Sequence, residues 1–184
     1  MTTDKQTRVA VLLGSTRSGS LNRRIAEHLR DHAPAGVTVD VVEGLDAVPF
    51  YNEEIDGDSV PASATALRDS VAASDVVLAV TPEYNGTMPA VLNNAIDWLS
   101  RPYGQGAIVG KPFAAIGATP TPYGGKWSHE HARHSATIAG AVVVDDDAVD
   151  ESAVEGDPLQ DEAAVRRFLG ALDALVAHEV EVAA

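Results

Sequence analysis

Residues 14–22 read GSTRSGSLN and place four hydroxyl side chains and an arginine directly after the apolar run RVAVLL. The apolar run is typical of a buried strand, and Leu21, Ile25 and Leu29 indicate that a helix follows it. The first turn of a helix offers free backbone amides and the positive end of the helix dipole, which together favour an anion. Hydroxyl and guanidinium donors in the same loop suit a phosphate. We therefore predict a phosphate site at the start of this helix.

The positions of glycine and lysine in this loop indicate which class of phosphate ligand it could bind. No lysine occurs between Lys5 and Lys111, so the GxxxxGK[ST] motif of nucleoside triphosphatases is absent. Gly14 and Gly19 are five residues apart, which does not fit the GxGxxG motif of dinucleotide-binding folds. A terminal monophosphate fits the loop better. The alternative is an ordinary turn rich in serine and glycine, in which Ser20 only caps the helix.

A second loop, with the sequence TPEYNGTMP from residue 81 onward, follows another apolar run. Pro82 and Gly86 are typical of a tight turn, and Tyr84 supplies an aromatic face beside exposed backbone amides. A flat heteroaromatic ring could rest on such a surface. This loop and the phosphate loop are therefore candidates for the two ends of one ligand.

Runs of apolar residues without alternation predict five strands that are buried on both faces, at residues 9–13, 37–42, 76–80, 113–118 and 141–144. Segments of helical periodicity lie between and after them, the last one spanning Val165 to Val176. Alternating strands and helices predict an α/β fold, a three-layer α/β/α sandwich with a parallel sheet in the order 2-1-3-4-5. We expect one domain over residues 1–184. In this strand order the two loops meet where the order of the strands reverses, which is where such sheets bind ligands.

The composition excludes several classes of function. The chain lacks cysteine, so disulfides, thiolate metal sites and cysteine nucleophiles are excluded. The formal net charge of −14 would repel nucleic acids. No apolar run reaches the length of a membrane span, and the polar start MTTDKQTR does not resemble a secretory signal, so we expect a cytoplasmic protein without membrane contact. Three lysines and 16 aspartates resemble the bias of proteins from salt-rich cytoplasm, although an ordinary acidic protein is the alternative.

Two polar segments are interpreted as solvated. Residues 145–162 contain nine acidic residues but lack the spacing of an EF-hand, so we expect a solvated loop and no calcium site. The segment HEHARH at 129–134 is not the HExxH motif, and we expect its histidines on a solvated helix face. No metal site is predicted.

The two loops together resemble those of a known family. GSTRSGSLNRRIA is similar to the GSxRxxSxN phosphate loop, and TPEYNGTMPAVLNNAIDWLSRP to the PEYN segment, of the flavodoxin-like NAD(P)H-dependent FMN reductases. This family includes quinone, chromate and azo-dye reductases. VPFYNEE at 48–54 and GKPFAAIGATPTPYGG at 110–125 also match segments of the family, so the resemblance covers most of the chain.

The resemblance implies a flavodoxin-like fold, FMN as cofactor and NADPH or NADH as co-substrate. In the family, hydride passes from the nicotinamide to the flavin, and a small acceptor such as a quinone, free flavin, chromate or an azo compound then takes two electrons. No catalytic side chain is required, and members are commonly homodimers or homotetramers. The residues that would bind the phosphate end of FMN are Ser15, Arg17, Ser20, Leu21 and Asn22. Those that would contact its ring are Pro82, Glu83, Tyr84, Asn85, Gly86, Thr119 and Pro120.

Two other functions remain open at this stage. A flavodoxin-type carrier would pass electrons between proteins without being an enzyme, but flavodoxins use a threonine-rich phosphate loop with a TG pair that this chain lacks. A module that senses or carries a phosphorylated metabolite would need only the phosphate loop. Oxidation of a reduced nicotinamide in the presence of a quinone distinguishes the three.

Overall fold

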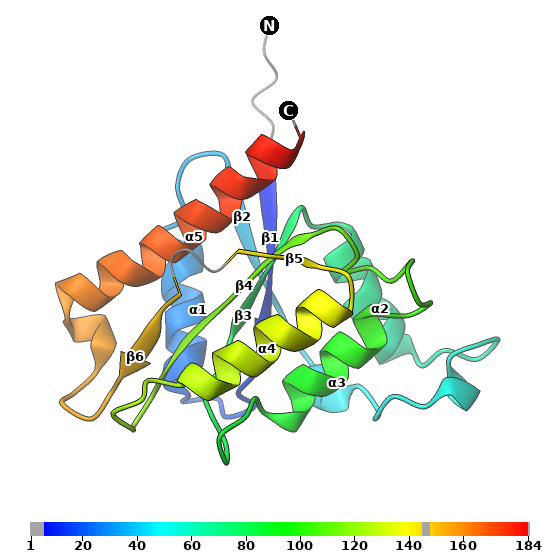
Figure 1. The fold of residues 1–184 in the computed structure, drawn as a ribbon, viewed down its shortest axis with the longest axis horizontal. Coiled ribbons are helices and arrows are strands. Elements are labelled where there is room, and N and C mark those ends of the chain that lie inside the picture. The colour runs from blue at the N-terminus through cyan, green and yellow to red at the C-terminus, as the bar shows by residue number, and fades with distance from the viewer. Residues whose placement is uncertain (1–5, 145–147, 184) are drawn as a thin grey trace, which may run out of the picture.

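A parallel β-sheet forms the centre of the computed structural model, which describes residues 6–144 and 148–183 (Figure 1). Five strands follow the order β2-β1-β3-β4-β5, and β6 pairs with β4 outside this path. This confirms the predicted strand order. The strands are β1 (Thr7–Leu13), β2 (Val37–Val42), β3 (Val76–Val80), β4 (Pro112–Thr119), β5 (Val142–Val143) and β6 (Asp150–Ser152).

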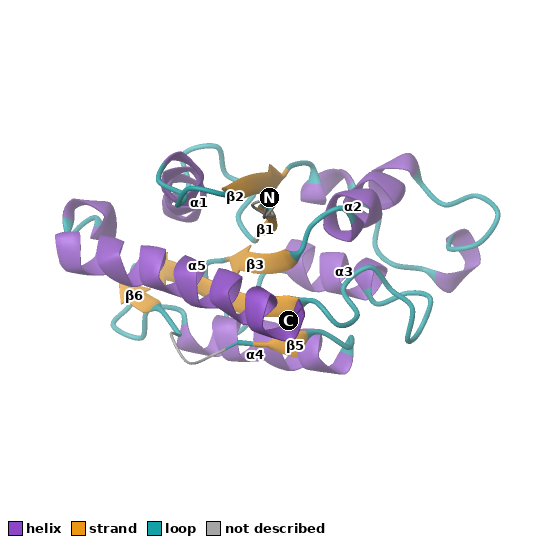
Figure 2. Cartoon of the chain, turned by 90° about the horizontal axis from the view of Figure 1, so that it is seen from above, coloured by secondary structure: helices purple, strands orange, loops and turns teal. Residues whose placement is uncertain are grey.

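Within the described residues, five α-helices cover the two faces of the sheet, and three short 3-10 helices lie in the connections. Figure 2 shows α1 and α2 on opposite sides of the neighbouring strands β1 and β2. The α-helices are α1 (Leu21–Asp31), α2 (Ala62–Ala72), α3 (Ala90–Leu99), α4 (Lys126–Ile138) and α5 (Glu162–Ala183), and the 3-10 helices are Leu45–Ala47, Glu53–Ile55 and Pro158–Gln160.

The hydrophobic core has two halves because successive residues of a strand point to opposite faces. In β1, Ala10 and Leu12 pack with residues of α2, α3 and α4, whereas Val9, Val11 and Leu13 pack with residues of α1 and α5. Every residue of β3 and β4 is buried. Covering both faces of the sheet explains why these strands read as continuous apolar runs.

The strand β6 lies inside the segment that was expected to be a solvated loop. Residues 150–152 form a strand rather than a loop, although Asp150 and Ser152 are exposed as expected. The fifth predicted strand is shorter than expected, and β5 pairs only with Pro112 and Phe113 of β4. The far half of β4 is therefore open to another partner, and Gly117 to Thr119 pair in parallel with Asp150 to Ser152. Residues 145–147 of the acidic segment lie outside the described residues. Among the helices that are described, none is both long and apolar enough to cross a membrane.

Candidate functional site

Three loops meet at the carboxyl edge of the sheet, along the lower edge of the view in Figure 1. We name them the phosphate loop (residues 14–20), the ring loop (81–89) and the third loop (120–125). The Gly14 amide donates to the Val80 carbonyl at 3.0 Å, and the Thr81 amide donates to the Ile116 carbonyl at 3.0 Å. A Cβ at Gly14 would lie 2.1 Å from Thr81 Oγ1, so only glycine fits. The phosphate loop and the ring loop therefore contact each other at the point where they leave the sheet.

The phosphate loop presents donors at the start of α1. Ser20 is 1% exposed and is the N-cap, since its Oγ accepts from the Arg23 amide at 3.3 Å. That bond uses an oxygen lone pair and leaves the hydroxyl hydrogen available to a ligand. Residues 16–19 are exposed, and the first turn of α1 carries no acidic residue. This arrangement fits an anion.

Of the three arginines in or just after this loop, Arg17 is exposed, whereas Arg23 pairs with Glu43 and Arg24 pairs with Asp157. The Arg23 guanidinium donates two hydrogen bonds to Glu43 at 2.7 and 3.0 Å, which raise the pKa of Arg23 and lower the pKa of the Glu43 carboxyl. The pair borders a cavity of about 40 Å³ that Ser15 and Thr16 also line. The exposed charge at the mouth of the loop is therefore that of Arg17.

Asn22 connects α1 to β4. Its Nδ2 donates to the Ala118 carbonyl at 2.9 Å, and its Oδ1 accepts from the Ala118 amide at 3.0 Å. The side chain is buried, and these bonds use one of the two Nδ2 hydrogens. The neighbouring Leu21 packs against the half of the core that is formed with α1 and α5. In the phosphate loop, Ser15 is also buried, with 3% of its surface exposed. Asn22 thus fixes the start of α1 against the sheet, an interaction that its sequence motif did not indicate.

The ring loop contains a two-residue hairpin turn. Tyr84 and Thr87 exchange backbone hydrogen bonds of 3.0 and 3.1 Å, and the central residues Asn85 and Gly86 have φ of 53° and 72°. Positive φ at both positions defines a type I′ turn, for which Asn-Gly is the preferred pair. The turn holds Tyr84 with 49% of its surface exposed, so its ring is available for stacking.

The Glu83 carboxylate lies at the start of α4. Its Oε2 accepts from the amides of Trp127 at 3.1 Å and Ser128 at 3.3 Å, while Ser128 Oγ donates to the Pro82 carbonyl at 2.8 Å. The N-cap of α4 is Gly125, which has no side chain to fill this role. The sequence placed Glu83 only beside the ring; the structure gives its carboxylate the further role of capping a helix.

The third loop runs from β4 to α4. Thr119 is 1% exposed and its hydroxyl is 2.9 Å from that of Thr121, whereas Pro120 is exposed. Gly124 and Gly125, with φ of 65° and 97°, turn the chain into α4. Thr119 and Pro120 therefore lie at the same edge of the sheet as the other two loops.

His129 corrects the expectation that the histidines of α4 are solvated. It is fully buried: its Nδ1 lies 2.5 Å from Asp150 Oδ1, and its Nε2 lies 3.1 Å from the Thr81 carbonyl oxygen. Positions 128, 129, 132 and 136 form the buried stripe of α4, and this helical spacing was the signal that could have placed His129 inside. In the described part of the chain, no three His, Asp or Glu side chains are placed to hold a metal ion.

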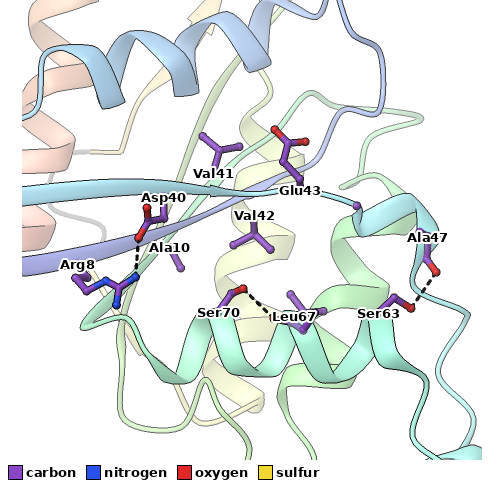
Figure 3. Close-up of a pocket in the computed structure, with 12 residues that line it drawn as sticks. Arg8, Ala10, Asp40, Val41, Val42, Glu43, Ala47, Ser63, Leu67 and Ser70 are labelled. Carbon is purple, nitrogen blue, oxygen red and sulfur yellow. Dashed lines mark hydrogen bonds and ion pairs between the residues drawn. The ribbon is translucent and has the colours of Figure 1, made fainter.

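A separate pocket of about 300 Å³ lies between β2 and α2 (Figure 3). Several of its polar side chains bond to each other or to the backbone: Arg8 pairs with Asp40 at 3.1 Å, and Ser63 Oγ donates to the Ala47 carbonyl at 3.1 Å. None of the residues predicted to bind FMN lines this pocket. The three-loop edge is therefore the stronger candidate site.

Comparisons with known proteins agree with this site. The family model described as NADPH-dependent FMN reductase matches residues 7–154. A quinone reductase of Pseudomonas putida is 43% identical over 127 residues, which cover 69% of this chain and 68% of the relative. A 2-hydroxy-1,4-benzoquinone reductase of a Burkholderia species is 40% identical over 126 residues, covering 68% of each chain.

Among solved structures, the flavoenzyme NAD(P)H:(acceptor) oxidoreductase FerB of Paracoccus denitrificans superposes with a TM-score of 0.83 and 31% identity. The match covers 95% of this chain and 98% of FerB. The region matched by the family model, residues 7–154, contains all three loops and the strands that carry them. The chain thus belongs to the NADPH-dependent FMN reductase family and is an oxidoreductase with FMN as cofactor and NAD(P)H as co-substrate.

Proposed function

We propose that the chain binds FMN across the three-loop edge and uses it to reduce quinones at the expense of NADPH or NADH. The observation that carries the proposal is the contact between the phosphate loop and the ring loop, because it brings an anion site and an exposed aromatic face to one edge of the sheet. Relatives named as quinone reductases favour a quinone over free flavin, chromate or an azo compound as acceptor.

The phosphate end of FMN would be held by the backbone amides of the phosphate loop, the hydroxyls of Ser15 and Ser20, and the Arg17 guanidinium. Leu21 and Asn22 begin α1, and the Asn22 amide holds that helix start against β4. A phosphate at a helix start gains from both the free amides and the helix dipole. These groups would anchor the cofactor rather than take part in electron transfer.

The ring end would lie against Pro82 to Gly86, with Thr119 and Pro120 at its side. The type I′ turn fixes the backbone of residues 84–87, and exposed backbone groups of Asn85 and Gly86 would then be available to the ring. When bound, FMN supplies the two-electron chemistry, and the chain contributes binding, orientation and oriented backbone dipoles. No protein side chain is assigned as acid, base or nucleophile.

The test is the oxidation of NADPH and of NADH by the FMN-loaded protein, followed with and without a benzoquinone. Quinone-dependent turnover supports the proposal. FMN binding without turnover would favour a flavodoxin-type electron carrier, and failure to bind FMN would favour a module for another phosphorylated metabolite.

We further propose that the chain works in the cytoplasm as one domain that assembles into a homodimer or homotetramer. The net charge of −14 supports adaptation to a salt-rich cytoplasm, because counterions would screen its self-repulsion. Stability that rises with salt, together with a mass measured by light scattering, tests these points; maximal stability in dilute buffer would contradict the adaptation to salt.

A further inference from the structure

The buried His129 side chain connects three parts of the molecule beneath the candidate site. It belongs to the first turn of α4, its Nδ1 contacts Asp150 of β6, and its Nε2 contacts the carbonyl oxygen of Thr81. Thr81 is the first residue of the ring loop and directly precedes Pro82. A single side chain therefore joins the ring loop to a helix and to the strand β6.

Both partners of the ring are hydrogen-bond acceptors. A neutral imidazole carries one N–H and can donate to only one of them, whereas an imidazolium donates to both. The Asp150 carboxylate suits an Nδ1–H donor, because hydrogen bonds to a carboxylate are strong. Its side chain is 28% exposed, so the pair lies at the edge of the core rather than deep within it.

Two glycines show how closely this contact is packed. A Cβ at Gly117 would lie 2.2 Å from the Thr81 carbonyl oxygen and 3.0 Å from His129 Nε2. A Cβ at Gly125 would lie 3.0 Å from His129 Cε1. The imidazole thus fills a space bounded by the backbone of β4, the ring loop and the start of α4, in close contact with the Thr81 carbonyl.

We propose that His129 and Asp150 are positioning residues for FMN, acting through the Thr81 carbonyl to fix the ring loop. This inference rests on the proposed placement of the FMN ring against residues 82–86. Asp150 orients the imidazole, the imidazole holds Thr81, and the type I′ turn then presents Tyr84 in one orientation. Neither residue contacts the cofactor in this scheme.

The experiment uses two variants of Asp150 and a control on the same strand. Asp150→Ala removes the partner of His129, and Asp150→Asn retains an oxygen that accepts from Nδ1 but removes the charge. The control is Glu151→Gln, because the neighbouring Glu151 pairs instead with Arg167 of α5. Readouts are the FMN dissociation constant from fluorescence quenching, the visible circular dichroism of bound FMN, and hydrogen exchange of residues 81–88 in the FMN-free protein.

We expect Asp150→Ala to weaken FMN binding about tenfold, as for a lost hydrogen bond to a charged group, with altered dichroism and faster exchange in the ring loop. Asp150→Asn should lie between Asp150→Ala and the wild type, and Glu151→Gln should match the wild type. His129→Leu gives a second test and should reproduce Asp150→Ala. Wild-type values in both Asp150→Ala and His129→Leu overturn this inference alone, whereas a wild-type protein that does not bind FMN overturns the proposed function with it.

Discussion

Replacing Glu83 by alanine is expected to destabilise α4 even without FMN. The substitution removes the acceptor of two amides in the first turn of the helix, those of Trp127 and Ser128. Gly125 at the N-cap offers no side chain in its place. These amides would then depend on water, and the charge that complements the helix dipole would be lost.

The size of the effect follows from these two contributions. Loss of an N-cap acceptor costs about 0.5–2 kcal/mol, and loss of a favourable charge at the helix start costs about 0.3–1 kcal/mol. We therefore expect a loss of about 1–2 kcal/mol. For a chain of this size, that loss corresponds to a decrease in Tm of roughly 2–8 °C. Glu83→Gln retains an acceptor oxygen and should lose about half as much.

Thermal unfolding of the FMN-free protein, followed by circular dichroism, measures this difference. Glu130→Ala is the matched control because Glu130 lies on the same helix and, among the described residues, forms only an exposed pair with Lys126 at 3.9 Å. Its stability should change by no more than about 0.5 kcal/mol. If Glu83→Ala melts at the wild-type temperature, the carboxylate does not cap α4 and the reasoning fails.

Three further outcomes are expected. Arg17→Ala should weaken FMN binding by about 10- to 100-fold, as for a lost charge-assisted hydrogen bond; Arg17 is exposed, so the Tm of the FMN-free protein should stay unchanged, and full FMN affinity would contradict the phosphate site. Hydrogen bonds from Arg68 lower the pKa of the Asp56 carboxyl below its ordinary 3.8, so this pair stabilises the fold above that pH and its contribution is lost as the pH falls. Urea unfolding from pH 5 to pH 3 should therefore show a smaller acid-dependent loss in Asp56→Asn than in the wild type, and equal slopes would contradict the pairing. Burial and the stacked His32 ring lower the pKa of His28 below its ordinary 6.5, so the folded state loses stability as the pH falls through 6.5. Urea unfolding between pH 7 and pH 5.5 should show a smaller loss of stability in His28→Gln than in the wild type. An equal loss would exclude His28 as the source of this pH dependence.

The sequence predicted the sheet well where burial dominates. The runs that became β1, β3 and β4 are almost wholly apolar, because both faces of the sheet are covered there. The edge strand β2 is only partly buried and includes the polar residues Thr38 and Asp40. The phosphate loop and the ring loop were identified as candidates because their residue types can bind a phosphate or an aromatic ring whatever the surrounding fold. Their contact depended on the strand order, which the fold class supplied.

What could not be predicted depends on pairing between distant segments. The strand β6 has the polar sequence Asp-Glu-Ser, and it is a strand because the far half of β4 lacks another partner. The helical spacing of α4 could have indicated that His129 is buried, but its partner Asp150 is 21 residues away in the chain. Similarly, the bonds of Asn22 to Ala118 span 96 residues. None of these distant partners can be recognised from the local sequence pattern.

A crystal structure of the protein with bound FMN would show directly whether the cofactor lies across the three loops. In that structure we expect the phosphate within hydrogen-bond distance of the amides of residues 16–19 and of the Arg17 guanidinium, with the ring against Tyr84 to Gly86. The Ser20 amide is not included because it already donates to the Arg17 carbonyl at 3.1 Å. FMN bound elsewhere, for example in the pocket between β2 and α2, would contradict this expectation.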